Sequence, residues 1–84
     1  MPIFAIKNLK IISIRALSEG KHLKLTLKSE KNTYVDAIGF NLGEKTNEFV
    51  IGDKIDIAGH LEINLFNGVE SIQINLKDIK KSCQ

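Results

Sequence analysis

The sequence predicts an all-β domain, and two observations lead to that prediction. Residues 54–80 contain two runs in which apolar and polar residues alternate, which is the period of a strand and not of a helix. Between the runs stands Asn67-Gly68, a dipeptide typical of a two-residue hairpin turn. We therefore expect the last third of the chain to form a long β-hairpin.

The same alternation predicts two strands near the N-terminus. The first is expected at residues 9–17, and the second at residues 22–28, after a short turn rich in turn-favouring residues. The second strand is the more regular of the two, because Leu23, Leu25 and Leu27 alternate with polar residues. These leucines are expected to face the interior.

A third strand and a link complete the pattern. The strand is expected at residues 33–40, where Gly39 can mark a bend or bulge. Residues 41–47 are polar and are expected to form a turn of helix that packs Phe49 or Val50 beneath the sheet.

Three strands, a short helical or irregular link and two more strands are the outline of a five-stranded OB-fold, a Greek-key barrel. A small SH3-like barrel and an open meander are the alternatives. Phe4 and Phe40 are expected in the core. The residues expected to line the barrel interior are Leu23, Leu25, Leu27, Ile57, Ile72, Ile74 and Leu76.

Length and composition indicate one soluble domain at residues 1–84. No apolar run approaches the roughly 20 residues that cross a bilayer, and no signal-peptide pattern precedes Lys7. The one cysteine, Cys83, has no partner for an intramolecular disulfide, which favours a reducing compartment. We therefore expect a cytoplasmic protein with no membrane contact.

Charge is unevenly distributed along the chain. Residues 1–31 hold seven Lys or Arg against two acidic residues, whereas residues 32–76 hold two lysines against seven acidic residues. This asymmetry predicts a basic face that could meet a polyanion, although an ordinary solvated surface explains it equally well.

Nothing in the sequence predicts catalysis. His22 and His60 are the only histidines, and neither has a Cys or second His at metal-ligand spacing. The glycines form no phosphate-binding loop. We expect a non-catalytic chain without catalytic residues, a metal site or a cofactor of its own.

A binding surface is the remaining prediction. Lys24 and Lys28 stand two pleats apart on one strand, and such cations can follow a phosphate backbone. Tyr34 and Phe66 are the candidate platforms for stacked bases, although Tyr34 could equally be a half-buried strand residue. The full set of candidate nucleic-acid-binding residues is Lys21, His22, Lys24, Lys28, Lys31, Tyr34, Phe66 and Asn67.

Five segments carry a resemblance to a known family. They are HLKLTL at residues 22–27, DAIGFN at 36–41, GDKIDIA at 52–58, LEINLFNG at 61–68 and SIQINLKDI at 71–79. In this order they resemble the C-terminal OB domain of RecJ, the bacterial single-stranded-DNA-specific exonuclease family. Members of that family often carry tryptophan where this chain has Phe66.

The resemblance implies that this chain is a piece of a larger enzyme. RecJ-like enzymes degrade single-stranded DNA from its 5′ end in repair and recombination, with Mn or Mg held by an Asp-His-His core that has no match here. The implied role of this domain is to grip the single strand beside the nuclease core. The implied partners are single-stranded DNA, the rest of the parent chain and a single-stranded-DNA-binding protein, with the chain itself a monomer.

Two other functions stay open. The acidic segment between Glu44 and Glu70 favours a structural or protein-interaction module that braces the nuclease core or docks a single-stranded-DNA-binding protein. An RNA-binding OB domain, such as the anticodon-binding part of a tRNA synthetase, would have a similar barrel and surface.

Overall fold

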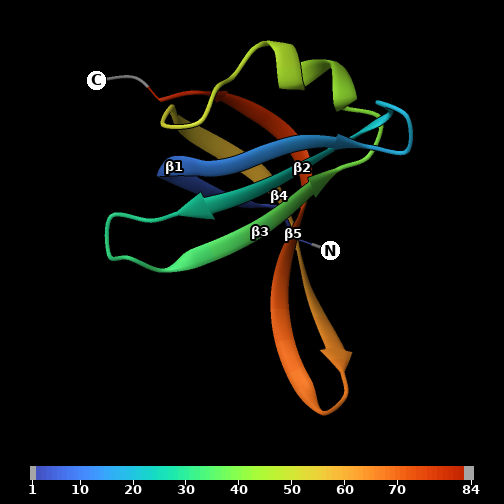
Figure 1. The fold of residues 1–84 in the computed structure, drawn as a ribbon. Coiled ribbons are helices and arrows are strands. Elements are labelled where there is room, and N and C mark those ends of the chain that lie inside the picture. Colours follow the sequence, from blue (N-terminus) through green and yellow to red (C-terminus); the bar gives the residue numbers. More distant parts are fainter. Residues whose placement is uncertain (1, 83–84) are drawn as a thin grey trace.

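The computed structural model describes residues 2–82, and these form a closed barrel of five strands with one short 3-10 helix (Figure 1). The elements in chain order are β1 (Phe4–Leu17), β2 (His22–Lys28), β3 (Tyr34–Gly39), η1 (Gly43–Asn47), β4 (Lys54–Phe66) and β5 (Val69–Lys81). The strand order is β1-β2-β3-β5-β4, and β4 pairs back with β1. The predicted OB-fold is confirmed, including the short helical link between the third and fourth strands.

β1 is longer than expected, because it begins at Phe4, and it is interrupted twice. Its register with β4 shifts between Ile6 and Leu9, around Asn8 with a φ of 59°. Its register with β2 shifts between Ile11 and Ser13. Each shift inserts a residue, so the strand bends and the alternation of faces restarts. One strand can therefore pair with β4 along its first half and with β2 along its second.

The core fills the barrel, and most of its residues follow the predicted alternation. Leu23, Leu25 and Leu27 are completely buried, and Ile57, Ile74 and Leu76 are at most 3% exposed. Phe49 is also buried, whereas Val50 beside it is 65% exposed, so Phe49 is the residue that packs beneath the sheet. The buried apolar residues are Leu9, Ile11, Leu23, Leu25, Leu27, Ala37, Phe49, Ile55, Ile57, Ile74, Leu76 and Ile79.

Three residues expected in the core are exposed. Ile72 is 56% exposed, although it lies on the same face of β5 as the buried Ile74. The reason is that β3 pairs with β5 only from Gln73 to Asn75, and the hairpin continues beyond the barrel. Phe4 is 48% exposed at the first residue of β1, at the barrel rim. Phe40 is 51% exposed and lies edge-on against the ring of His22, with 5.2 Å between the centroids. The prediction was wrong for all three.

The β4–β5 hairpin projects from the barrel, as Figure 1 shows in orange. Asn67 and Gly68 form its turn with φ values of 50° and 78°, the conformation that a type I′ turn requires. Where the hairpin leaves the barrel, a Cβ on Gly59 would collide with the carbonyl oxygen of Asn75. Only glycine therefore allows β4 to approach β5 so closely at this point.

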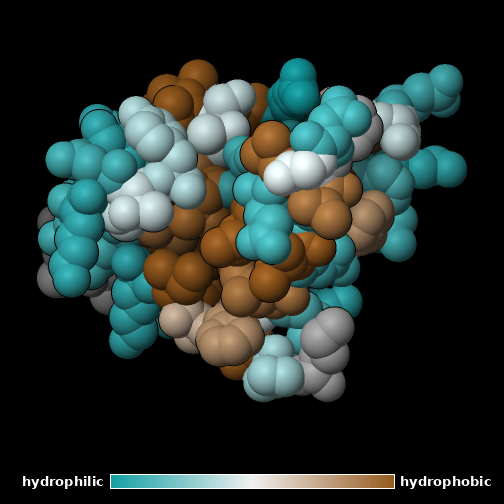
Figure 2. Space-filling model, turned by 90° about the horizontal axis from the view of Figure 1, so that it is seen from below, coloured by the Kyte–Doolittle hydropathy of each residue, from teal (hydrophilic) through white to brown (hydrophobic). Residues whose placement is uncertain are grey.

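One side of the projecting hairpin is apolar and uncovered. Leu61, Ile63 and Leu65 share a face by their alternation, and Ile72 joins them because it pairs with Ile63. We call these four residues the hairpin apolar face; they are 37% to 71% exposed. Figure 2 views the molecule from the end of the barrel at which the hairpin projects; apolar side chains gather in the middle of this view, with polar groups around them.

Two isoleucines on the same strand test where the core ends. Ile74→Ala should lower the free energy of unfolding by about 2–5 kcal/mol, the usual cost of a large deletion in a core. Ile72→Ala removes the same atoms from an exposed position and should cost much less, because those atoms stay in water in the folded protein. Urea unfolding of both variants provides the comparison. Equal losses would show that the hairpin base belongs to the core.

Candidate nucleic-acid interface

The outer face of β2 carries the predicted row of polar side chains. His22, Lys24, Thr26 and Lys28 are each partly exposed, and the leucines between them are buried. Lys24 and Lys28 therefore do lie on one face, two pleats apart.

The neighbouring strands β1 and β3 place further charged side chains beside those of β2. Lys24 pairs with Arg15 of β1, so two cations lie side by side at this level. Thr26 pairs with Asp36 of β3, and the two side chains approach to 3.4 Å between Oγ1 and Oδ1. A carboxylate thus lies between Lys24 and Lys28, and the cations do not form an uninterrupted line along β2.

Tyr34, a candidate platform for a stacked base, is exposed beside this row. It pairs with Lys28 across β2 and β3, and it is 61% exposed, so it is not the half-buried residue of the alternative prediction. The ammonium of Lys28 lies 5.6 Å from the ring centroid, within range of a cation–π interaction. The ring is thus accessible and has a cation beside it.

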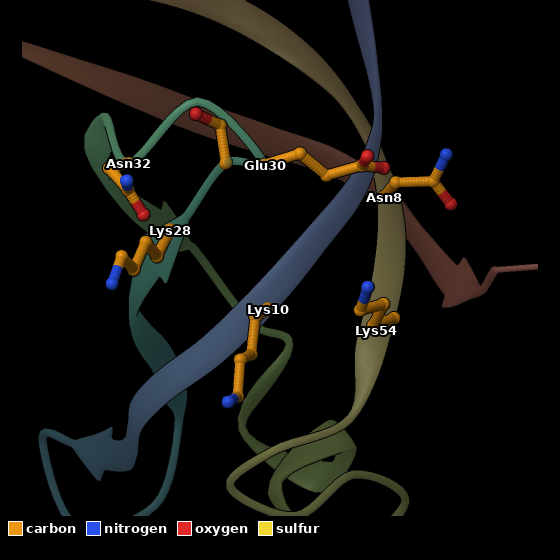
Figure 3. A pocket seen from close by; sticks show the side chains of 7 residues that line it. Asn8, Lys10, Lys28, Glu30, Asn32 and Lys54 are labelled. Carbon is orange, nitrogen blue, oxygen red and sulfur yellow. The ribbon is translucent and has the colours of Figure 1, made fainter.

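A second group of cations was missed by the sequence analysis. Lys10 of β1 pairs with Lys28 on one side and with Lys54 on the other, so three neighbouring strands each carry a lysine at the same level. We call these three residues the lysine row. They line a pocket of about 170 Å³ together with Asn8 and Asn32, as well as Ser29 and Glu30 (Figure 3).

The lysine row has no carboxylate at ion-pair distance. Within the described part of the chain, the only ion pair joins Lys45 and Glu48, at 3.3 Å and away from this pocket. Glu30 lines the pocket, but its side chain extends toward Asn8 (Figure 3). The positive charge of the row is therefore available to a ligand.

The bulge at Asn8 determines where Lys10 points. The backbone N–H of Asn8 donates to Oδ1 of Asp56 at 3.0 Å, and the hydroxyl of Ser82 donates to the same oxygen at 2.6 Å. The Ser82 hydrogen bond, followed by that from Asn8, lowers the pKa of Asp56 below its ordinary value of 3.8. After the bulge, Leu9 is buried and Lys10 is exposed beside Lys54.

The remaining predicted residues lie around this face or apart from it. Nδ1 of His22 accepts a hydrogen bond from the backbone N–H of Asn41 at 3.0 Å. This nitrogen is therefore bonded to the segment that follows β3 and is not free for a ligand. Lys21 and Lys31 are exposed in the turns at the two ends of β2. Asn67 is exposed at the tip of the projecting hairpin. The side chain of Phe66 lies outside what the structure describes, as does Cys83.

Two kinds of feature are absent from residues 2–82. No group of three or more His, Cys, Asp or Glu side chains there is arranged to hold a metal ion. No helix in this part of the chain is long and apolar enough to span a membrane.

Comparison with known families decides the classification. The family model described as the RecJ OB domain matches residues 1–78. The chain belongs to this family. A curated relative, the single-stranded-DNA-specific exonuclease RecJ of Bacillus subtilis (strain 168), is 32% identical over 78 residues. That match covers 92% of this chain and 10% of the relative, so the RecJ OB domain described here spans about a tenth of the relative's length.

Solved structures support the fold of this RecJ OB domain. The second single-stranded-DNA-binding protein of Mycobacterium smegmatis superposes with a TM-score of 0.78 at 20% identity, over 98% of this chain and 87% of that one. A mitochondrial single-stranded-DNA-binding protein of S. cerevisiae gives a TM-score of 0.77 at 14% identity, over 98% and 97% of the two chains. At such identities the likeness shows a shared fold.

The hydrogen bonds of Asp56 should make stability depend on pH. Because its pKa is lowered on folding, Asp56 stabilises the folded state above pH 3.8 or so, and this contribution is lost as pH falls through the lowered pKa. Asp56→Asn should therefore be less stable than wild type at neutral pH, and the difference should shrink in acid. Urea unfolding from pH 7 to pH 2 measures it.

Ser82→Ala provides the matched variant, because it removes the hydrogen bond that lowers the pKa of Asp56 most. The acid-dependent loss of stability should be smaller in this variant than in wild type. An identical pH dependence in wild type and Asp56→Asn would contradict the assignment.

Proposed function

We propose that this domain binds single-stranded DNA on the outer face of β2 and β3 and acts as the DNA grip of a RecJ-type exonuclease. The observation that carries the proposal is the exposed ring of Tyr34 with the ammonium of Lys28 beside it. A stacking surface next to a cation suits a single strand, which offers unpaired bases and phosphates at short intervals.

The rest of the face supplies further cations. Arg15 and Lys24 lie side by side two pleats from Lys28, a separation of about 13 Å along the strand. Phosphates of one extended strand can contact both groups and release counterions at each contact. Lys21 and Lys31 at the ends of β2 would extend this footprint, and Phe66 and Asn67 would add contacts from the hairpin tip.

The longer relative supports a role within a nuclease. Because the matching relative is a single-stranded-DNA-specific exonuclease about ten times longer than the match, we assign hydrolysis, with its Mn or Mg, to parts of the parent outside this domain. The parent would act in the cytoplasm in DNA repair and recombination. This domain would bind as a monomer, with a single-stranded-DNA-binding protein as a further partner.

Substitutions at Lys24 and Tyr34 should weaken DNA binding in different ways. Lys24→Ala should reduce affinity for a short oligothymidylate at low salt and lower the salt dependence by about 0.7 for one lost phosphate contact. Tyr34→Ala should cost about 1–3 kcal/mol with an almost unchanged salt dependence, since stacking releases no counterions. Fluorescence anisotropy across a salt series measures both quantities.

Tyr34→Phe is the matched control, because it keeps the ring and should retain most of the affinity. The RNA oligomer of the same base sequence tests the RNA-binding alternative. Tight binding of the RNA and weak binding of the DNA would contradict the proposal.

A second candidate function rests on the hairpin apolar face. Its four exposed aliphatic side chains form a patch of the kind that marks a protein interface. We propose the rest of the parent exonuclease as the occupant, because most of the relative's length lies outside the matched domain. An apolar hairpin that inserts into a neighbouring domain would hold the DNA grip at a fixed distance from the nuclease core.

Hydrogen–deuterium exchange tests this second function. Residues 61–72 should exchange more slowly in the full-length parent than in the isolated domain, because a docked partner shields the hairpin edges. The backbone of β2, which is paired with β1 on one side and β3 on the other, should change little and serves as the internal control. Equal exchange of the hairpin in both proteins would show that the apolar face is uncovered in the parent as well.

A further inference from the structure

The lysine row crosses the barrel at right angles to the path that the alternation along β2 predicts. Lys54, Lys10 and Lys28 come from three adjacent strands at one level, and neighbouring strands lie about 4.8 Å apart. Tyr34 continues the same line onto β3, because it is the register partner of Lys28. Four strands thus present three cations and an aromatic ring in sequence.

An anionic ligand would reduce the electrostatic repulsion among the three lysines. Like charges directly opposite each other destabilise a strand pair, and the row contains two such pairs. Within the described residues, no carboxylate lies at ion-pair distance from any of the three ammonium groups. The side-chain amides of Asn8 and Asn32, which also line the pocket, are further hydrogen-bond donors.

A strand that binds at Lys28 and Tyr34 can extend from there in two directions, which differ in the charges that the DNA meets. A strand that follows β2 from Lys24 to Lys28 passes the carboxylate of Asp36, which lies beside Thr26 and repels phosphate. A strand that crosses from β4 over β1 to β2 meets the lysine row and then Tyr34. This second path also has a carboxylate near it, that of Glu30, which lines the pocket and extends toward Asn8 (Figure 3).

We propose that the lysine row is a phosphate-binding site and that single-stranded DNA crosses β4, β1 and β2 over it, placing the next base on Tyr34. The ligand class is a phosphate diester or a free phosphate. The DNA path extends the strand of the proposed function, which contacts Lys24, Lys28 and Tyr34, onto β1 and β4, and it therefore rests on that function, whereas the capacity to bind phosphate does not. Lys28 belongs both to the lysine row and to the outer face of β2 and β3, and it connects the row to Tyr34.

The test uses the double variant Lys10→Gln/Lys54→Gln, which leaves Lys28 and the rest of the β2 face intact. In low-salt buffer without phosphate, this variant should melt at a higher temperature than wild type, because the like-charge pairs are gone. Inorganic phosphate should raise the melting temperature of wild type through binding to the folded state and should have a smaller effect on the variant. The first result follows from charge repulsion alone, so the second is the decisive one: measured against sodium chloride at equal ionic strength, it requires bound phosphate.

Oligothymidylate binding then tests the path. The double variant should lose about 1.4 from the salt dependence, which corresponds to two phosphate contacts on a single strand. Lys7→Gln is the control: it is on the same strand, but its side chain lines a different pocket with Asp56 and Asp78. That control should leave both the salt dependence and the response to phosphate unchanged.

The outcomes separate this inference from the function on which its DNA path rests. Oligothymidylate binding that is weakened by Lys24→Ala, with an unchanged salt dependence in the double variant, would overturn the crossing path and leave the proposed function intact. Phosphate stabilisation through the row without any oligothymidylate binding would support the anion site and overturn both the path and the proposed function. An equal response to phosphate in wild type and double variant would overturn the anion site.

Discussion

The barrel depends on one short contact, the parallel pairing of β3 with β5 over three residue pairs. It joins the N-terminal meander to the C-terminal hairpin and places Leu25, Ala37 and Ile74 in one buried layer. Without it, the leucines of β2 would face solvent on an open sheet. Closure also brings β4 against β1, and this pairing creates the alignment of Lys54 with Lys10. The core and the candidate binding surface therefore have a common origin in the same ring of strand pairs.

Some parts of the fold could be predicted from short stretches of sequence, because no distant strand alters them. The alternation within β2 and the turn at Asn67 and Gly68 follow from residues adjacent in the sequence, whereas the choice between Phe49 and Val50 for burial was left open by the sequence. Alternation predicts which side chains of a strand share a face. It does not predict where the neighbouring strand that covers them ends. That point is decided by β3, some 35 residues before Ile72, and for this reason the exposure of Ile72 could not be predicted from its own strand.

The candidate site was predictable only along one strand. Period two places Lys24 and Lys28 on one face, but the residues beside them depend on register, which sequence alone does not reveal. Asp36 therefore came as an unexpected carboxylate between the lysines, and Lys10 and Lys54 were missed because 44 residues separate them. His22 was a candidate by position, yet its ring is engaged by the backbone of Asn41.

The two bulges of β1 divide this strand into three segments whose faces are set separately. Deletion of Asn8 would remove the extra residue of the first bulge, so that Ile6, Lys7 and Leu9 would pair regularly with Ile57, Asp56 and Ile55 and no side chain would change face. The local bend of β1 and the hydrogen bond from the N–H of Asn8 to Asp56 would be lost, whereas Lys10 would stay paired with Lys54 and Lys28. The curvature of β1 and the cations on its outer side can therefore change independently as sequences in this family drift.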